Sequence, residues 1–162
     1  MNMKTLTIRN HNIHDTALLL LRTMTGAVFA FHGAQKLFGL FGGHGLNGFA
    51  AYLGSLGIPF PLANAWLAAS AEFLGGVALL AGVGVGFASV PLVVTMLVAS
   101  FALRAGGFDA QKGGFEFPLT LAVVTASVGL LGAGRFTLLN ALRRVKNAQE
   151  KCEPSVPQVS LP

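Results

Sequence analysis

Long apolar runs, separated by short segments rich in glycine or proline, dominate this sequence. A helix of about 20 apolar residues crosses a hydrocarbon layer of roughly 30 Å, so runs of this length predict membrane-spanning helices. The fourth run is short, but its proline lies in the first helical turn, where it is tolerated. The pattern predicts an all-α integral membrane protein, a four-helix bundle with spans at about 15–37, 62–80, 85–105 and 115–131.

Two shorter segments carry apolar residues on one side only. Between the first and second spans, a segment too short to cross a membrane places Phe49, Tyr52, Leu53 and Leu56 on one helical face. It predicts a short interfacial helix between spans 1 and 2. After the fourth span, apolar positions alternate with basic ones, which predicts an amphipathic C-terminal helix on the membrane surface. Its residues include Phe136, Leu138, Leu139, Leu142, Val145, Arg143, Arg144 and Lys146.

These elements divide the chain into three parts. Residues 1–14 form a polar N-terminal segment, expected to be disordered or interfacial. Residues 15–134 form the four-span membrane domain, and residues 135–162 form a basic cytoplasmic tail. An uncleaved first helix is favoured over a signal peptide, because Arg22 interrupts its apolar run.

Composition supports the membrane class and fixes a topology. Hydrophobic residues make up 53% of the chain, and the net charge is +5. Eight Lys and Arg residues lie on the side of the two termini and three lie on the other side. Basic residues accumulate on the cytoplasmic side, so a multi-pass protein with both termini in the cytoplasm is predicted. The lipid bilayer is its first expected partner.

Other function classes are disfavoured by the same residues. The basic positions are not interleaved with aromatic residues on a polar face, so no nucleic acid partner is expected. Cys152 is the single cysteine, which excludes a thiol–disulfide mechanism within one chain. No cluster of cysteine and histidine has the spacing of a metal site, so no metal is predicted.

A few polar residues within the apolar spans are the candidates for function. A charge inside a spanning helix costs about 2.5–3.5 kcal/mol on insertion scales, so it marks a site or a paired contact. Glu72 lies in mid-span among alanines and glycines, which predicts that it faces the bundle. In the predicted topology every span carries a polar group into the outer leaflet. The resulting polar pocket contains His32, Gln35, Lys36, Glu72, Arg104 and Glu116.

Each of these residues also has a purely structural explanation. Arg104 and Glu116 flank a short loop, where interfacial charges are ordinary. Lys36 lies at a helix end and can extend its ammonium to the lipid headgroups. A buried pair of Glu72 with a basic residue can serve only to fix the packing of two helices.

The segment His32–Gly39, with the sequence HGAQKLFG, resembles a signature of the DoxX family of small bacterial membrane proteins. Further ordered matches run through residues 48–59, 71–76, 113–117 and 132–136. The resemblance implies a four-helix bundle in the bacterial cytoplasmic (inner) membrane. Some relatives are subunits of a thiosulfate:quinone oxidoreductase, which also needs a DoxA-like part, and others belong to membrane oxidoreductase complexes.

The first functional hypothesis is a membrane subunit of a quinone-linked oxidoreductase system. A quinone, as the substrate, would reach the pocket from the outer leaflet, and electrons would come from a soluble or membrane redox partner. Proton transfer is assigned to the catalytic candidates Glu72, His32 and Glu116. Quinone binding is assigned to Gln35, Lys36, Arg104, Phe29 and Phe73.

The alternative hypothesis is non-enzymatic: a membrane scaffold or small-solute-binding protein whose buried charges are structural ion pairs. Homo-oligomers are compatible with both hypotheses. A proton-coupled transporter is disfavoured, because one copy of the chain lacks an inverted repeat and broken spans.

Overall fold

The computed structural model describes residues 3–152 of the 162-residue chain. Within that range it is helical and contains no strand, which confirms the all-α prediction. Three short 3-10 turns, η1 (Leu40–Gly42), η2 (Arg104–Gly106) and η3 (Ala110–Lys112), lie in the connections. The α-helices are α1 (Met3–Phe38), α2 (Gly45–Ser55), α3 (Pro61–Ala81), α4 (Val85–Ala102), α5 (Glu116–Leu131) and α6 (Leu138–Cys152).

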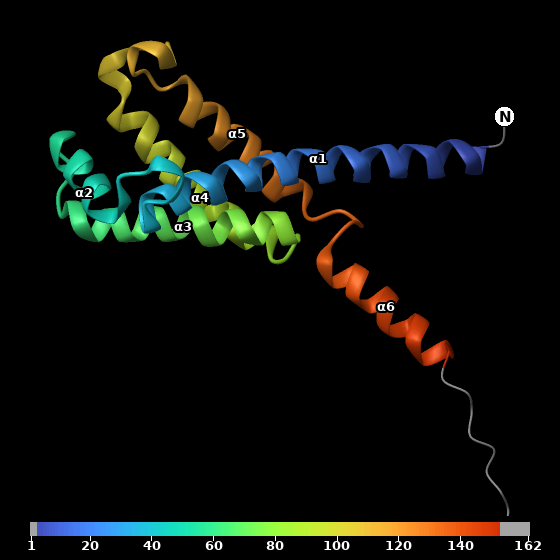
Figure 1. Ribbon diagram of the computed structural model, residues 1–162. Helices are drawn as coiled ribbons and strands as arrows, with labels where there is room; N and C mark the ends of the chain where they lie inside the picture. Colours follow the sequence, from blue (N-terminus) through green and yellow to red (C-terminus); the bar gives the residue numbers. More distant parts are fainter. Residues whose placement is uncertain (1–2, 153–162) are drawn as a thin grey trace, which may run out of the picture.

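The helices pack mainly as neighbouring pairs. Helix α1 lies along α3, α3 packs on α4, and α4 packs on α5 (Figure 1). The short helix α2 contacts both α1 and α3 at one end of the bundle. Helices α4 and α5 are inclined to the α1–α3 pair, whereas α6 runs away from the bundle. This arrangement places α2 beside the end at which α1 finishes and α3 begins.

Three helical segments are long and apolar enough to cross a membrane: Asn12–Phe38, Pro61–Ala81 and Val85–Ala102. Helix α5 is apolar but has only 16 residues. The structure therefore confirms the membrane class and the positions of the predicted helices, including α2 and α6. The fourth crossing stays a prediction.

The N-terminal segment differs from its prediction. Helix α1 begins at Met3, so residues 3–14 continue the first helix and are not disordered. An interfacial position for this segment stays a prediction. Neither proline nor glycine occurs between Met3 and Gly26, and an established helix extends at the gain of one hydrogen bond per residue. Residues 1–2, and the end of the tail at 153–162, lie outside the described residues.

At the end of the bundle opposite α2, Arg22 ties α1 to the chain that follows α5. Its side chain is only 2% exposed, and it donates hydrogen bonds to the carbonyl oxygens of Ala133 (3.1 Å) and Phe136 (2.6 Å). Nearby, the buried carboxylate of Asp15 accepts a hydrogen bond from the backbone N–H of Arg135 at 3.2 Å. The start of the apolar part of α1 and the end of α5 therefore lie on the same side of the bundle.

We expect Gly82→Ala to be more destabilising than Gly84→Ala. Both glycines have positive φ, of +69° and +58°, so both alanines carry the same backbone strain. A Cβ at Gly82 would also overlap the guanidinium of Arg22, whereas nothing lies within 4 Å of a Cβ at Gly84. Because it displaces Arg22, Gly82→Ala should lower the free energy of unfolding by roughly 1–2 kcal/mol more than the control Gly84→Ala does. Thermal unfolding in detergent measures both variants, and equal melting temperatures would contradict the contact.

Candidate functional site

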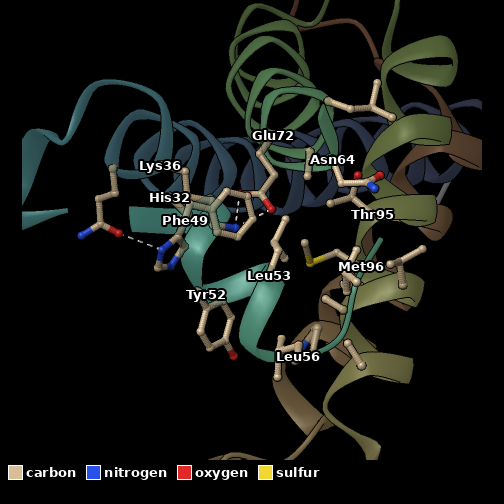
Figure 2. Close-up of a pocket in the computed structure, with 18 of the residues that line it drawn as sticks. His32, Lys36, Phe49, Tyr52, Leu53, Leu56, Asn64, Glu72, Thr95 and Met96 are labelled. Atoms are coloured by element: carbon tan, nitrogen blue, oxygen red, sulfur yellow. Dashed lines mark hydrogen bonds and ion pairs between the residues drawn. The ribbon is translucent and has the colours of Figure 1, made fainter. Parts of the chain in front are cut away.

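A cavity of about 630 Å³ lies between α2 and the spanning helices (Figure 2). Its walls come from the C-terminal end of α1, from α2 with its preceding loop, from the first half of α3, from the second half of α4 and from the start of α5. The volume is in the range of pockets that bind small organic ligands. Most of the lining is apolar, including Leu53, Leu56, Ala68, Met96, Ala99 and Leu121.

An ion pair between α1 and α3 forms one polar part of the wall. The ammonium nitrogen of Lys36 lies 2.6 Å from each carboxylate oxygen of Glu72. Glu72 is 1% exposed, so it faces the bundle, as its small neighbours predicted. The same ammonium lies 4.8 Å from the centroid of the Phe49 ring on α2 (Figure 2). Lys36 therefore joins three elements, α1, α2 and α3, at the cavity.

Close packing of α1 against α3 explains why the pair can form. Gly33 lies against the backbone of Phe73, where a Cβ would come within 2.6 Å of the Phe73 Cα. One turn earlier on α1, the backbone of Ala30 lies equally close to Gly76 of α3. Glycines at such crossings let two helix backbones approach. Lys36, three residues after Gly33, is thereby brought over Glu72.

His32 and Gln35 form a second polar group beside the ion pair. The Gln35 amide nitrogen donates to the carbonyl oxygen of Phe41 at 3.3 Å, and the Gln35 amide oxygen lies 3.0 Å from Nδ1 of His32. Because the amide oxygen of Gln35 can only accept, Nδ1 of His32 is the donor in this contact. Through its bond to Phe41, Gln35 anchors the glycine-rich loop before α2. The ring of Phe41 also stacks on that of Phe31, with centroids 4.8 Å apart.

Five of the predicted site residues meet at the cavity: Phe29, His32, Gln35, Lys36 and Glu72 all line it. Phe29 is 1% exposed and forms part of the apolar wall. These residues come from two stretches of sequence, four of them from α1 and Glu72 from α3. Their chemical roles stay predictions.

Three predicted residues do not line the cavity: Arg104, Glu116 and Phe73. Arg104 is exposed in η2, where it donates to the Phe101 carbonyl at 2.8 Å and covers the Phe101 ring at 3.9 Å. It leaves the wall because α4 ends at Ala102, so Arg104 no longer follows the helical face.

Glu116 and Phe73 do not line the cavity because their side chains point away from it. Glu116 is the first residue of α5 and is half-buried, while the next two residues, Phe117 and Pro118, turn to the cavity. Phe73 points to the other side of α3, with its ring 5.3 Å from that of Phe38 in an edge-to-face contact.

The cavity also holds polar side chains that were not predicted as site residues: His44, Tyr52, Asn64 and Thr95. Tyr52 was placed on the apolar face of the interfacial helix, and that face does form one wall of the cavity. Asn64 had a usable signal, because an amide near the start of an apolar span needs hydrogen-bond partners. Thr95 had none, since threonine often bonds to its own helix.

Part of the cavity wall reaches the lateral surface of α3 and α4. Three of its lining residues are largely exposed on the lateral surface of these helices: Leu67 (71%), Val94 (54%) and Val98 (52%). Both helices belong to the segments that can cross a membrane. A ligand dissolved in the bilayer could therefore enter sideways. Among the described residues, no group of His, Cys, Asp or Glu side chains could hold a metal ion.

The fold and the site define a small helical membrane protein with a buried Lys–Glu pair at a ligand-sized cavity. The chain belongs to the DoxX family, whose model matches residues 17–105. This match includes α2, α3, α4 and the ion pair, and it confirms the resemblance seen in the sequence. The chain is also 29% identical over 126 residues to a Bacillus subtilis (strain 168) protein named "Putative oxidoreductase CatD", covering 78% of this chain and 86% of that protein. No solved structure matches the chain.

Proposed function

We propose that this protein is the membrane subunit of a quinone-linked oxidoreductase system and that its cavity binds the quinone headgroup. The observation that carries the proposal is the Lys36–Glu72 pair at a mostly apolar cavity whose wall includes exposed side chains of two membrane-compatible helices. A membrane-dissolved ring with polar oxygens fits these surroundings. The reaction class is supported by the printed name of the Bacillus subtilis relative, "Putative oxidoreductase CatD".

The site residues have chemistry that suits a quinone. An ammonium has three N–H donors, and the two oxygens of the Glu72 carboxylate accept at most two of them. Lys36 therefore keeps an N–H that can donate to a quinone carbonyl. Reduction of a quinone by two electrons also takes up two protons. Glu72 is the proton-transferring group at the cavity, and His32 is the second. The electrons are assigned to a redox partner protein.

We place the protein in the bacterial cytoplasmic membrane with both termini in the cytoplasm and with α5 as the fourth crossing. The excess of Lys and Arg on the side of the termini supports this orientation. The hydrogen bonds of Arg22 to the segment after α5 hold both ends of the membrane domain at one side of the bundle. In this topology the cavity lies in the outer half of the bilayer.

The experiment that tests the proposal is a quinone titration followed by tryptophan fluorescence. Trp66 is the sole tryptophan and lies on α3 near the cavity residues Asn64 and Leu67, so its emission reports on ligand binding there. We expect a decyl-substituted benzoquinone to quench it saturably in detergent. The double variant Lys36→Met/Glu72→Met, which replaces the pair by apolar side chains of similar length, should remain folded and lose saturable quenching. Quenching that is linear in the wild type, or unchanged in the double variant, would contradict the proposal.

One observation favours the scaffold alternative: the charged groups of Lys36 and Glu72 are in direct contact, at 2.6 Å. Lys36 and Glu72 satisfy one another across α1 and α3, which is what a purely structural lock requires. The same double variant separates the two functions. A scaffold predicts no saturable quinone binding in the wild type and a protein partner that co-purifies equally with the wild type and the double variant.

A further inference from the structure

We propose that Asn64 and Thr95 form a hydrogen-bond-accepting end of the cavity, which binds a hydroxyl group of the ligand. The cavity would then favour a hydroquinone or phenol over the corresponding quinone or ether. The inference rests on the proposed function, because it describes the same cavity and the same class of ring. It adds the polarity of the ligand's second end, which the ion pair leaves open.

The side chain of Asn64 has no donor left for a ligand. Its amide nitrogen donates to the backbone carbonyls of Pro59 (2.7 Å) and Phe60 (3.5 Å), just before α3 begins. These two contacts also settle the orientation of the amide, since a carbonyl can face only its N–H₂ side. The amide oxygen is therefore the group that Asn64, as a lining residue, can offer to the cavity.

Thr95 on α4 is in the same condition. Its hydroxyl donates to the carbonyl oxygen of Pro91 at 2.8 Å, so the oxygen retains only lone pairs. Thr95 lines the cavity from the helix that packs against α3. In Figure 2 the side chains of Asn64 and Thr95 lie on the other side of the view from Lys36 and His32. Two acceptors and no free donor thus belong to this end.

The spacing of the two polar ends suits a single ring. Asn64 precedes Glu72 by eight residues on the same helix, which separates their positions by about 12 Å along its axis. A ring with two para oxygens, hydrogen-bonded at each end over about 2.7 Å, spans roughly 11 Å. The apolar side chains of Leu53 and Met96 lie between the two ends and can cover the ring.

A hydroxyl at this end donates to an acceptor, whereas a carbonyl or ether oxygen would meet only lone pairs. A hydrogen bond contributes about 0.5–1.5 kcal/mol net, which corresponds to roughly a three- to tenfold preference in dissociation constant. The preference should depend on the Thr95 hydroxyl, because Asn64 and Thr95 are the acceptors at this end.

Calorimetric titration of the full-length protein in detergent with β-naphthol and its methyl ether tests the inference. The two probes share one ring system and differ in the hydroxyl donor. We expect the wild type to bind β-naphthol roughly three- to tenfold more tightly. Thr95→Val, which keeps the shape of the side chain and removes its oxygen, should reduce the preference. The matched control Thr95→Ser keeps the oxygen and should preserve it.

The outcomes separate this inference from the proposed function. Equal affinities of the two probes for the wild type, or a preference unchanged in Thr95→Val, would overturn the accepting end while quinone quenching of Trp66 stands. Absence of binding by both probes together with absence of saturable quinone quenching would overturn both proposals. The wild-type ratio alone decides the question if Thr95→Val does not fold.

Discussion

Replacing Lys36 by methionine is expected to lower the free energy of unfolding by roughly 3–5 kcal/mol, the cost of removing one partner from a buried ion pair. The Glu72 side chain is 2% exposed and would keep its charge without a partner, or take up a proton to lose it. Glu72→Gln should cost less, because the Lys36 side chain is 27% exposed and can turn its ammonium toward the more polar side. Thermal unfolding in detergent should therefore rank wild type, Glu72→Gln and Lys36→Met in order of falling melting temperature.

Two controls give this ranking its meaning. The double variant Lys36→Met/Glu72→Met should recover most of the loss, since a buried ion pair is replaced by apolar packing. Lys112→Met removes a charge from the exposed pair with Asp109, at 3.8 Å, and should change stability by only about 0–1 kcal/mol. A Lys36→Met protein as stable as Lys112→Met, or a double variant no better than the single one, would show that the pair does not hold α1 to α3.

The helices of the bundle could be predicted from the sequence because apolar length and turn residues both mark their ends. The second span, predicted at 62–80, corresponds to α3 (Pro61–Ala81), which begins at a proline and ends before Gly82. The start of α1 could not be predicted in the same way, because no breaker separates its polar beginning from its apolar part. Hydropathy locates the membrane segment and says little about how far a helix continues beyond it.

Site residues could be predicted where burying a charge is costly. They could not be predicted where the direction of the side chain determines whether it lines the cavity. Lys36 and Glu72 stand out in sequence because an unpaired charge in an apolar span is costly. Arg104 and Glu116 have the expected depth, but depth along a helix does not fix which way a side chain points. Asn64 was missed because a neutral amide costs less to bury than a charge, so its presence in a span is a weaker signal.

Gly33→Ala is expected to destabilise the protein by roughly 3 kcal/mol, at the upper end of the costs of overpacking, because the obstructing atoms belong to a backbone. The new Cβ would come within 2.6 Å of the Phe73 Cα, so α1 and α3 must move apart. The matched control is Gly86→Ala on α4, where the nearest atom to a new Cβ is the Gly129 oxygen at 3.7 Å. That control should be unchanged or up to about 1 kcal/mol more stable, since alanine favours helix. Melting temperatures in detergent compare the two variants.

The same substitution links helix packing to the site. The Lys36–Glu72 contact at 2.6 Å depends on the close approach of α1 and α3 at Gly33, so separating the helices should lengthen it. Gly33→Ala should therefore weaken saturable quinone quenching of Trp66 even under conditions in which the variant remains folded, whereas Gly86→Ala should bind as the wild type does. A folded Gly33→Ala protein with wild-type quenching would mean that the cavity does not need the ion pair in this geometry. If Gly33→Ala instead loses both quinone binding and stability while Gly86→Ala keeps both, the α1–α3 crossing is the element that assembles the site.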